Sequence, residues 1–81
     1  MNMKRIELLP KWYEKEDKKD RTNKMTSAKK ELLASDLLPE KAKEKVQQIT
    51  CDMYLIADTY SRNYEIKMMN TYIDLFNSLS K

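Results

Sequence analysis

The sequence predicts an all-α protein: a small helical bundle or helical hairpin whose long C-terminal helix is kinked or broken. The protein is expected to form an oligomer. Three observations predict this fold. The 81 residues contain no glycine, apolar residues recur every three or four positions in the C-terminal half, and the remainder is rich in good helix formers. Without glycine, tight β-hairpin turns lack their preferred residue. A β-rich fold is therefore excluded.

The length and the cysteine count limit how this bundle is stabilised. A chain of this size forms one domain and buries only about 60–65% of the surface that it exposes when unfolded. Cys51 is the sole cysteine and there is no histidine, which excludes an intrachain disulfide and an ordinary zinc site. We expect no metal and no cofactor. Stability must then come from helix packing or from a partner.

Charge divides the chain into two regions. Residues 1–45 carry 13 Lys/Arg and 9 Asp/Glu, whereas residues 46–81 carry 3 and 4. We assign 1–24 as a charged N-terminal segment, partly helical or flexible, in which Pro10 ends a short apolar cluster. Between Lys11 and Lys24 a solvated helix over 11–20, which we favour, competes with a flexible linker.

Residues 25–81 form the predicted helical domain. Thr26 or Ser27 can cap a helix over 26–34, and its apolar stripe is Met25, Ala28, Leu32 and Leu33. Pro39 opens a second helix over 39–60. Its stripe follows coiled-coil spacing through Ala42, Val46, Ile49, Met53, Ile56 and Tyr60.

A third helix is predicted over 62–79. Continuing the previous stripe would bury Asn63, Lys67, Asn70 and Asp74, so the stripe fails there and restarts in a new phase at Tyr64. Two alternatives stay open. The two helices are continuous with a four-residue stutter, or the chain breaks near 61–63, which we favour.

Catalysis lacks its usual residues. There is no histidine for general base chemistry and no glycine-rich phosphate loop. Cys51 has no histidine to activate it, and we interpret it as a small, partly buried apolar residue. We predict a protein without enzymatic activity or a small-molecule substrate.

Protein binding is the predicted function. Tyrosine, methionine and tryptophan are enriched at interfaces, and the candidate partner-binding residues are Trp12, Tyr13, Tyr60, Tyr64, Met68, Met69, Tyr72 and Phe76. Under the simplest interpretation, most of the candidates on the C-terminal helix pack in the core of the bundle instead. The hypothesis is a regulator, adaptor or inhibitor that occupies another protein's surface, of a kind that suits a phage or mobile element.

Two alternatives use other features. A small basic accessory protein would contact DNA or RNA phosphates through Lys11, Lys15, Lys18, Lys19, Arg21, Lys24, Lys29 and Lys30. Interleaved carboxylates halve the charge of that stretch, so a solvated face explains it as well. The further alternative is a structural subunit that assembles with itself.

Partners and location follow from the same composition. No apolar run approaches the roughly 20 residues that span a bilayer, and the N-terminal residues show no signal-peptide cleavage pattern. We therefore expect a cytoplasmic protein without membrane contact. Its expected partners are another protein, a second copy in a homodimer, or nucleic acid under the alternative hypothesis.

Overall fold

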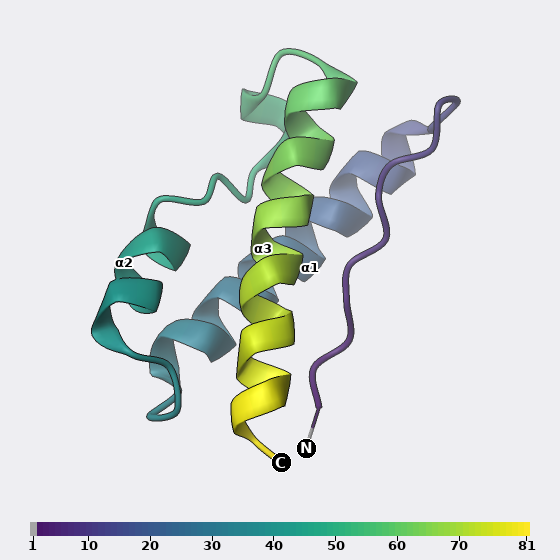
Figure 1. The fold of residues 1–81 in the computed structure, drawn as a ribbon. Coiled ribbons are helices and arrows are strands. Elements are labelled where there is room, and N and C mark those ends of the chain that lie inside the picture. The colour runs from purple at the N-terminus through teal and green to yellow at the C-terminus, as the bar shows by residue number, and fades with distance from the viewer. Residues whose placement is uncertain (1) are drawn as a thin grey trace.

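Two long helices form the centre of the molecule. The computed structural model describes residues 2–81 and contains α1 (Lys15–Ala34), α2 (Glu40–Gln47), the short 3₁₀ turn η1 (Met53–Leu55) and α3 (Thr59–Leu79). Helix α3 packs across α1, with α2 on one side of the pair and the N-terminal residues on the other (Figure 1). The described part of the chain has no β-strand, so the all-α prediction is confirmed.

Helix α1 joins two predicted segments into one. It begins at Lys15, where the Asp17 carboxylate accepts the Glu14 N–H at 2.8 Å. Thr26 therefore lies inside the helix and not at its start, and its hydroxyl donates to the Thr22 carbonyl. The helix is continuous because residues 15–34 contain no proline and because the residues that it buries lie on one face. That buried face consists of Arg21, Met25, Ala28 and Leu32.

The single helix predicted over 39–60 does not form. Helix α2 ends at Gln47, and the only helical turn in 48–58 is η1. Side chains from α1 hold this connection in place: the Lys29 ammonium donates to the carbonyls of Gln47 and Ile49, both at 2.8 Å, and Thr22 accepts the Met53 N–H at 3.0 Å. These long-range bonds replace the helical ones, so the chain turns although it has neither glycine nor proline here.

Helix α3 passes through residues 61–63 without a break. The Asp58 carboxylate caps its first turn by accepting the Ser61 N–H at 2.8 Å. The interruption that we favoured near Ser61 therefore lies earlier, in residues 48–58. Because the turn comes earlier, Tyr60 leaves the predicted stripe and is 81% exposed.

The core fills the space between the helices and the connection. It contains thirteen buried apolar residues: Ile6, Leu9, Met25, Ala28, Leu32, Leu38, Ala42, Val46, Ile49, Met53, Ile66, Met69 and Ile73. Arg62 is also buried and donates to the carbonyls of Met53 and Ile56 at 2.9 and 2.8 Å, which closes the loop before α3. No described residue has a positive φ, as expected for a chain without glycine.

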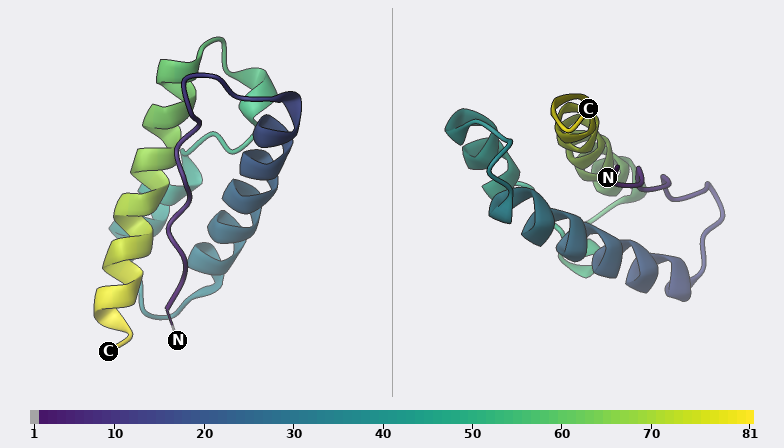
Figure 2. Two further views of the ribbon diagram at one scale, coloured as in Figure 1. Left: turned by 90° about the vertical axis from the view of Figure 1, so that its right-hand side faces the viewer. Right: turned by 90° about the horizontal axis from the view of Figure 1, so that it is seen from below.

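The N-terminal residues add an extended segment to this bundle. Residues 2–14 are not helical: residues 2–9 run antiparallel to α3, so that the start of the described chain lies near the end of α3, and residues 10–14 then cross to α1 (Figures 1 and 2). Seen from below in Figure 2, this segment and α2 cover opposite sides of the α1–α3 pair. The oligomer stays a prediction.

Candidate functional site

Three asparagines on α3 bind the extended segment through its backbone. The Asn70 side chain accepts the Ile6 N–H at 2.7 Å and donates to the Ile6 carbonyl at 2.8 Å. Asn63 makes the same pair of bonds with Leu9, at 2.7 and 3.0 Å, and Asn77 makes it with Met3, at 2.7 and 2.9 Å. We call these three side chains the asparagine ladder and residues 2–9 the strap.

The ladder works because two spacings agree. Seven helical residues advance about 10.5 Å along α3, and three extended residues advance about 9–10 Å along the strap. Each step from Asn63 to Asn70 to Asn77 therefore meets every third strap residue. Asparagine suits the position because its amide offers one acceptor and a donor side by side, matching the N–H and C=O of one residue.

Helix α1 holds the opposite edge of the strap. The buried Arg21 guanidinium donates to the carbonyls of Glu7 and Leu8, at 2.8 and 3.2 Å. Its charge is balanced by Asp20, at 2.8 Å, and by the Asp17 and Glu7 carboxylates at 3.8 Å each. The strap is thus bound by polar side chains from both long helices, while Ile6 and Leu9 insert into the core between them.

Sequence reasoning missed the ladder. Asn63 and Asn70 were interpreted as residues that could not continue a buried stripe, whereas Asn70 is in fact buried and Asn63 is partly buried. The available signal was the exact seven-residue repeat of asparagine at 63, 70 and 77. It carried no meaning until an extended segment was known to lie along that face.

The hinge, residues 10–14, meets η1 and the start of α3 at one end of the molecule. The Arg62 guanidinium donates to the Tyr13 hydroxyl, and the Tyr54 hydroxyl donates to the Lys15 carbonyl at 3.4 Å. The Lys18 ammonium lies 4.7 Å from the centre of the Tyr54 ring. A hydrogen bond with Thr59 and the nearby Arg62 and Lys18 charges lower the pKa of Tyr13, although its partial desolvation opposes them.

Large apolar side chains are exposed at this end. We call it the aromatic end, and its exposed members are Leu8, Trp12, Tyr54, Leu55, Tyr60 and Tyr64. Trp12, Tyr60 and Leu55 are 87%, 81% and 78% exposed. Of the remaining chain that the structure describes, only Leu37 and Leu79 are large, apolar and exposed, and both lie outside this end.

The predicted partner-binding residues fall into exposed, partly buried and fully buried groups in the structure. Trp12, Tyr60 and Tyr64 are exposed at the aromatic end, whereas Met69 is fully buried. The other four are partly buried and pack against the core: Tyr13, Met68, Tyr72 and Phe76. Tyr54 and Leu55 were not among the predicted partner-binding residues, and they lie in η1, within the range 39–60 where a single helix was predicted and does not form.

Half of the predicted phosphate-binding residues have structural partners. Arg21 and Lys29 hold backbone carbonyls, Lys24 pairs with Asp20 at 3.2 Å, and Lys18 lies over Tyr54. The Lys24 ammonium and the Arg21 guanidinium also lower the pKa of Asp20. The other four are exposed lysines in the hinge or on α1: Lys11, Lys15, Lys19 and Lys30.

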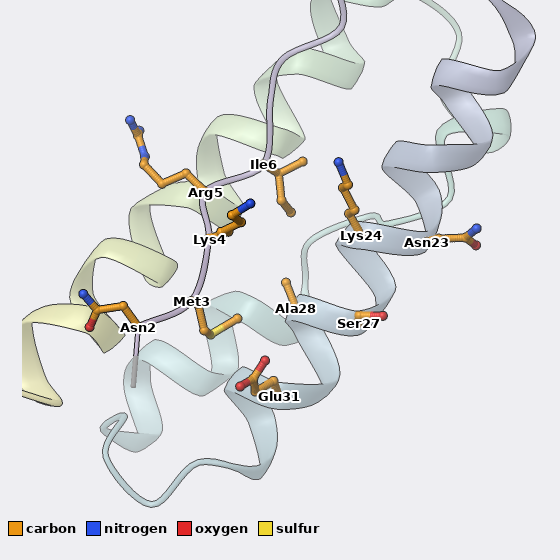
Figure 3. Close-up of a pocket in the computed structure, with 10 residues that line it drawn as sticks. All are labelled: Asn2, Met3, Lys4, Arg5, Ile6, Asn23, Lys24, Ser27, Ala28 and Glu31. Carbon is orange, nitrogen blue, oxygen red and sulfur yellow. The ribbon is translucent and has the colours of Figure 1, made fainter.

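A hollow of about 480 Å³ lies between the strap and α1 (Figure 3). Met3, Ile6 and Ala28 lie between the two segments, and the charged groups of Lys24 and Glu31 lie at the rim. The hollow brings together no pair of groups arranged for acid–base or nucleophilic chemistry. Its apolar surface belongs to the strap contact with α1.

Cys51 is half-buried, and its Sγ lies 3.5 Å from the Met25 carbonyl. Burial raises the pKa of this thiol, although the Lys29 ammonium opposes the shift. No cluster of three metal-ligating side chains occurs within residues 2–81. Nor is any helix in that range both long and apolar enough to cross a membrane.

Comparisons with protein-family models, curated proteins and solved structures found no match to this chain.

Proposed function

We propose that this protein binds another protein through its aromatic end and acts by occupying that partner's surface, as a regulator, adaptor or inhibitor. The observation that supports this most strongly is the concentration of exposed large apolar side chains at one end of a small, highly charged molecule. Such side chains are expensive to leave in water, and their clustering is typical of an interaction site.

The composition of the aromatic end suits a protein partner. Tryptophan and tyrosine are the residues that most often dominate binding energy at interfaces, and Trp12, Tyr60 and Tyr64 are all exposed here. Tyr60 and Tyr64 also flank a small hollow of about 160 Å³ that includes Lys67. A partner side chain can enter this hollow, while Lys67 beside it reaches a carboxylate on the partner.

Two residues of the aromatic end region, Tyr13 and Tyr54, are held in place by side-chain contacts with their neighbours. Arg62 links Tyr13 to the carbonyls before α3, and Tyr54 is held by Lys15 and Lys18. A surface whose supporting residues are already fixed loses little conformational entropy when it binds. These contacts support a preformed binding surface.

The experiment that tests this function is capture of a partner from lysate of the source cells by the tagged chain, with and without nuclease. Trp12→Ser and Tyr60→Ser are the test variants, and Leu79→Ser, which changes an exposed leucine outside the aromatic end, is the matched control. A protein that survives nuclease, is retained by the control and is lost by both test variants supports the proposal.

Binding is then measured with the purified partner. Loss of a central aromatic anchor costs about 2 kcal/mol or more, which corresponds to a roughly 30-fold weaker Kd. Equal affinity of the control and the test variants would exclude the aromatic end as the site. Captured material that disappears with nuclease would instead favour the nucleic-acid hypothesis, and a chain that forms large assemblies alone would favour the structural subunit.

A further inference from the structure

We propose that the groove between α1 and α3 is a binding site for an extended peptide, and that its occupant in trans is the strap of a second copy of this chain. Two copies would exchange straps, each inserting residues 2–9 into the other's groove. This inference rests on the asparagine ladder and not on the aromatic end. It therefore stands or falls independently of the proposed function.

The groove recognises the strap as a ligand. Six ladder bonds and two Arg21 bonds reach the backbone of the strap, and these bonds are the same for any side chains. Specificity comes from Ile6 and Leu9, which are 5% and 4% exposed and lie three residues apart. The groove thus selects an extended peptide with apolar residues at every third position.

Two charged pairs, each with at least one exposed partner, favour one register of that peptide by a small amount each. The Arg5 guanidinium lies 3.3 Å from the Asp74 carboxylate, and the Glu7 carboxylate lies 3.8 Å from Arg21. A slip by one rung, three residues, would keep two of the three rungs of the ladder and separate both charged pairs. The sequence that satisfies the backbone, the apolar positions and the charges together is the strap itself, which favours a second copy over an unrelated peptide.

The hinge permits the exchange. In the described structure no hydrogen bond joins the backbone of residues 10–13 to a helix, and the Glu14 N–H bonds locally to Asp17. Tyr13 is held by its bond with Arg62, and residues 10–12 between it and the strap span up to about 10 Å when extended. The strap can therefore leave its own groove while α1 and its first turn stay folded.

Exchange conserves every contact that the strap makes. The closed monomer and the exchanged dimer then differ mainly in association entropy and in the conformation of the hinge, which makes exchange a low-cost route to a dimer. In the monomer the tethered strap competes at an effective concentration on the order of millimolar. Exchange is consequently expected at high protein concentration, or when one copy's own strap is unable to compete.

The test mixes two full-length variants with complementary defects. Ile6→Asp/Leu9→Asp disables the strap and leaves the groove intact, whereas Asn63→Leu/Asn70→Leu disables the groove and leaves the strap intact. We expect each to sediment as a monomer of about 9.7 kDa and the mixture to form a 1:1 heterodimer of twice that mass. Leu8→Asp is the control, because it changes a strap residue that is 41% exposed. Its strap should stay in its own groove, so a mixture of Leu8→Asp with the groove-disabled variant should stay monomeric.

A labelled synthetic peptide with the sequence of residues 2–10 gives a second measurement that does not need two folded variants. The strap-disabled chain should bind it at least about tenfold more tightly than the unaltered chain, whose own strap competes. If the strap-disabled chain is partly unfolded alone, the peptide should restore its helical circular dichroism signal. A mixture that stays monomeric together with a peptide that neither binds nor restores structure would overturn the proposal.

Discussion

The strap and α2 cover opposite sides of the same helix pair, yet they are held by different forces. Helix α2 forms backbone hydrogen bonds within its own turns and docks by burying Ala42 and Val46, and Lys29 binds the carbonyl of its last residue, Gln47. The strap is extended and cannot satisfy its own backbone, so the molecule supplies Asn63, Asn70, Asn77 and Arg21 to do so. The difference shows that a buried extended segment needs polar partners along its whole length, whereas a buried helix needs an apolar face and polar partners only at its ends.

The largest expected effect tests the polar side of this comparison. Asn70→Ala removes two buried hydrogen bonds and leaves the N–H and C=O of Ile6 without partners. Each unsatisfied buried group costs about 1–3 kcal/mol, so we expect a loss of about 3–4 kcal/mol in the free energy of unfolding, measured with urea. Thr71→Ala, on the exposed side of the same helix, is the control. A loss below about 1 kcal/mol would mean that the ladder contributes little to stability.

The apolar side is tested by Val46→Ala in α2. Val46 is fully buried, and removing two methyl groups from the core should cost about 2 kcal/mol. Urea unfolding gives the value, and hydrogen exchange shows whether amides of α2 and of the connection after it open before the rest. If the strap amides opened first, the two coverings would be coupled and not independent.

A smaller effect is expected at the end of the ladder. Asn77→Ala breaks the same pair of bonds as Asn70→Ala, but Met3 and Asn77 are only partly buried. Water can then replace the amide, and the loss should be about 1 kcal/mol. Equal losses for Asn70→Ala and Asn77→Ala, compared under the same urea conditions, would show that burial does not set the strength of each rung.

Acid should weaken the start of α3 in a way that depends on Asp58. Bonds from the Ser61 N–H and hydroxyl lower the pKa of this carboxyl from its ordinary value of 3.8. A group whose pKa is depressed by folding stabilises the protein above its unfolded pKa, and that contribution disappears as the pH falls through the folded pKa. Between about pH 5 and pH 2, Asp58→Asn should therefore lose less stability than the unaltered chain, as followed by thermal unfolding. An equal loss in both chains would assign the acid sensitivity to other carboxyls.

The smallest expected effect is at the hinge. Trp12 is 87% exposed, so Trp12→Ser should change the free energy of unfolding by no more than about 0.5 kcal/mol. The fluorescence of the native chain should match that of a solvated tryptophan. A larger loss of stability would show that Trp12 packs on the domain, and would weaken its assignment as a binding residue.

The core was largely predictable from the sequence. Met25, Ala28 and Leu32 were assigned to one buried stripe, and they form the buried face of α1. In the stripe predicted over 39–60, Ala42, Val46, Ile49 and Met53 are buried, whereas Ile56 is only partly buried and Tyr60 is exposed. The predictions for the buried residues succeeded because burial follows apolar spacing even where the secondary structure was assigned incorrectly.

The candidate sites were predicted less completely. Exposure of Trp12, Tyr60 and Tyr64 depends on where α3 begins, and that is decided by contacts between residues far apart in the chain. Lys29, Thr22 and Arg62 hold the backbone of the connection before α3. No local pattern shows which carbonyl a distant lysine or arginine will reach, so the aromatic end was found only in part.

The sequence by itself determined that the protein is helical and that the apolar residues spaced three or four apart at 25–32 and 42–53 are buried. Only the tertiary structure decided where the chain leaves the helix and what the asparagines do. The physical reason is the range of the interactions. Helix formation and apolar periodicity depend on neighbours within about four residues, whereas Asn70 acquires its role from Ile6, 64 residues away.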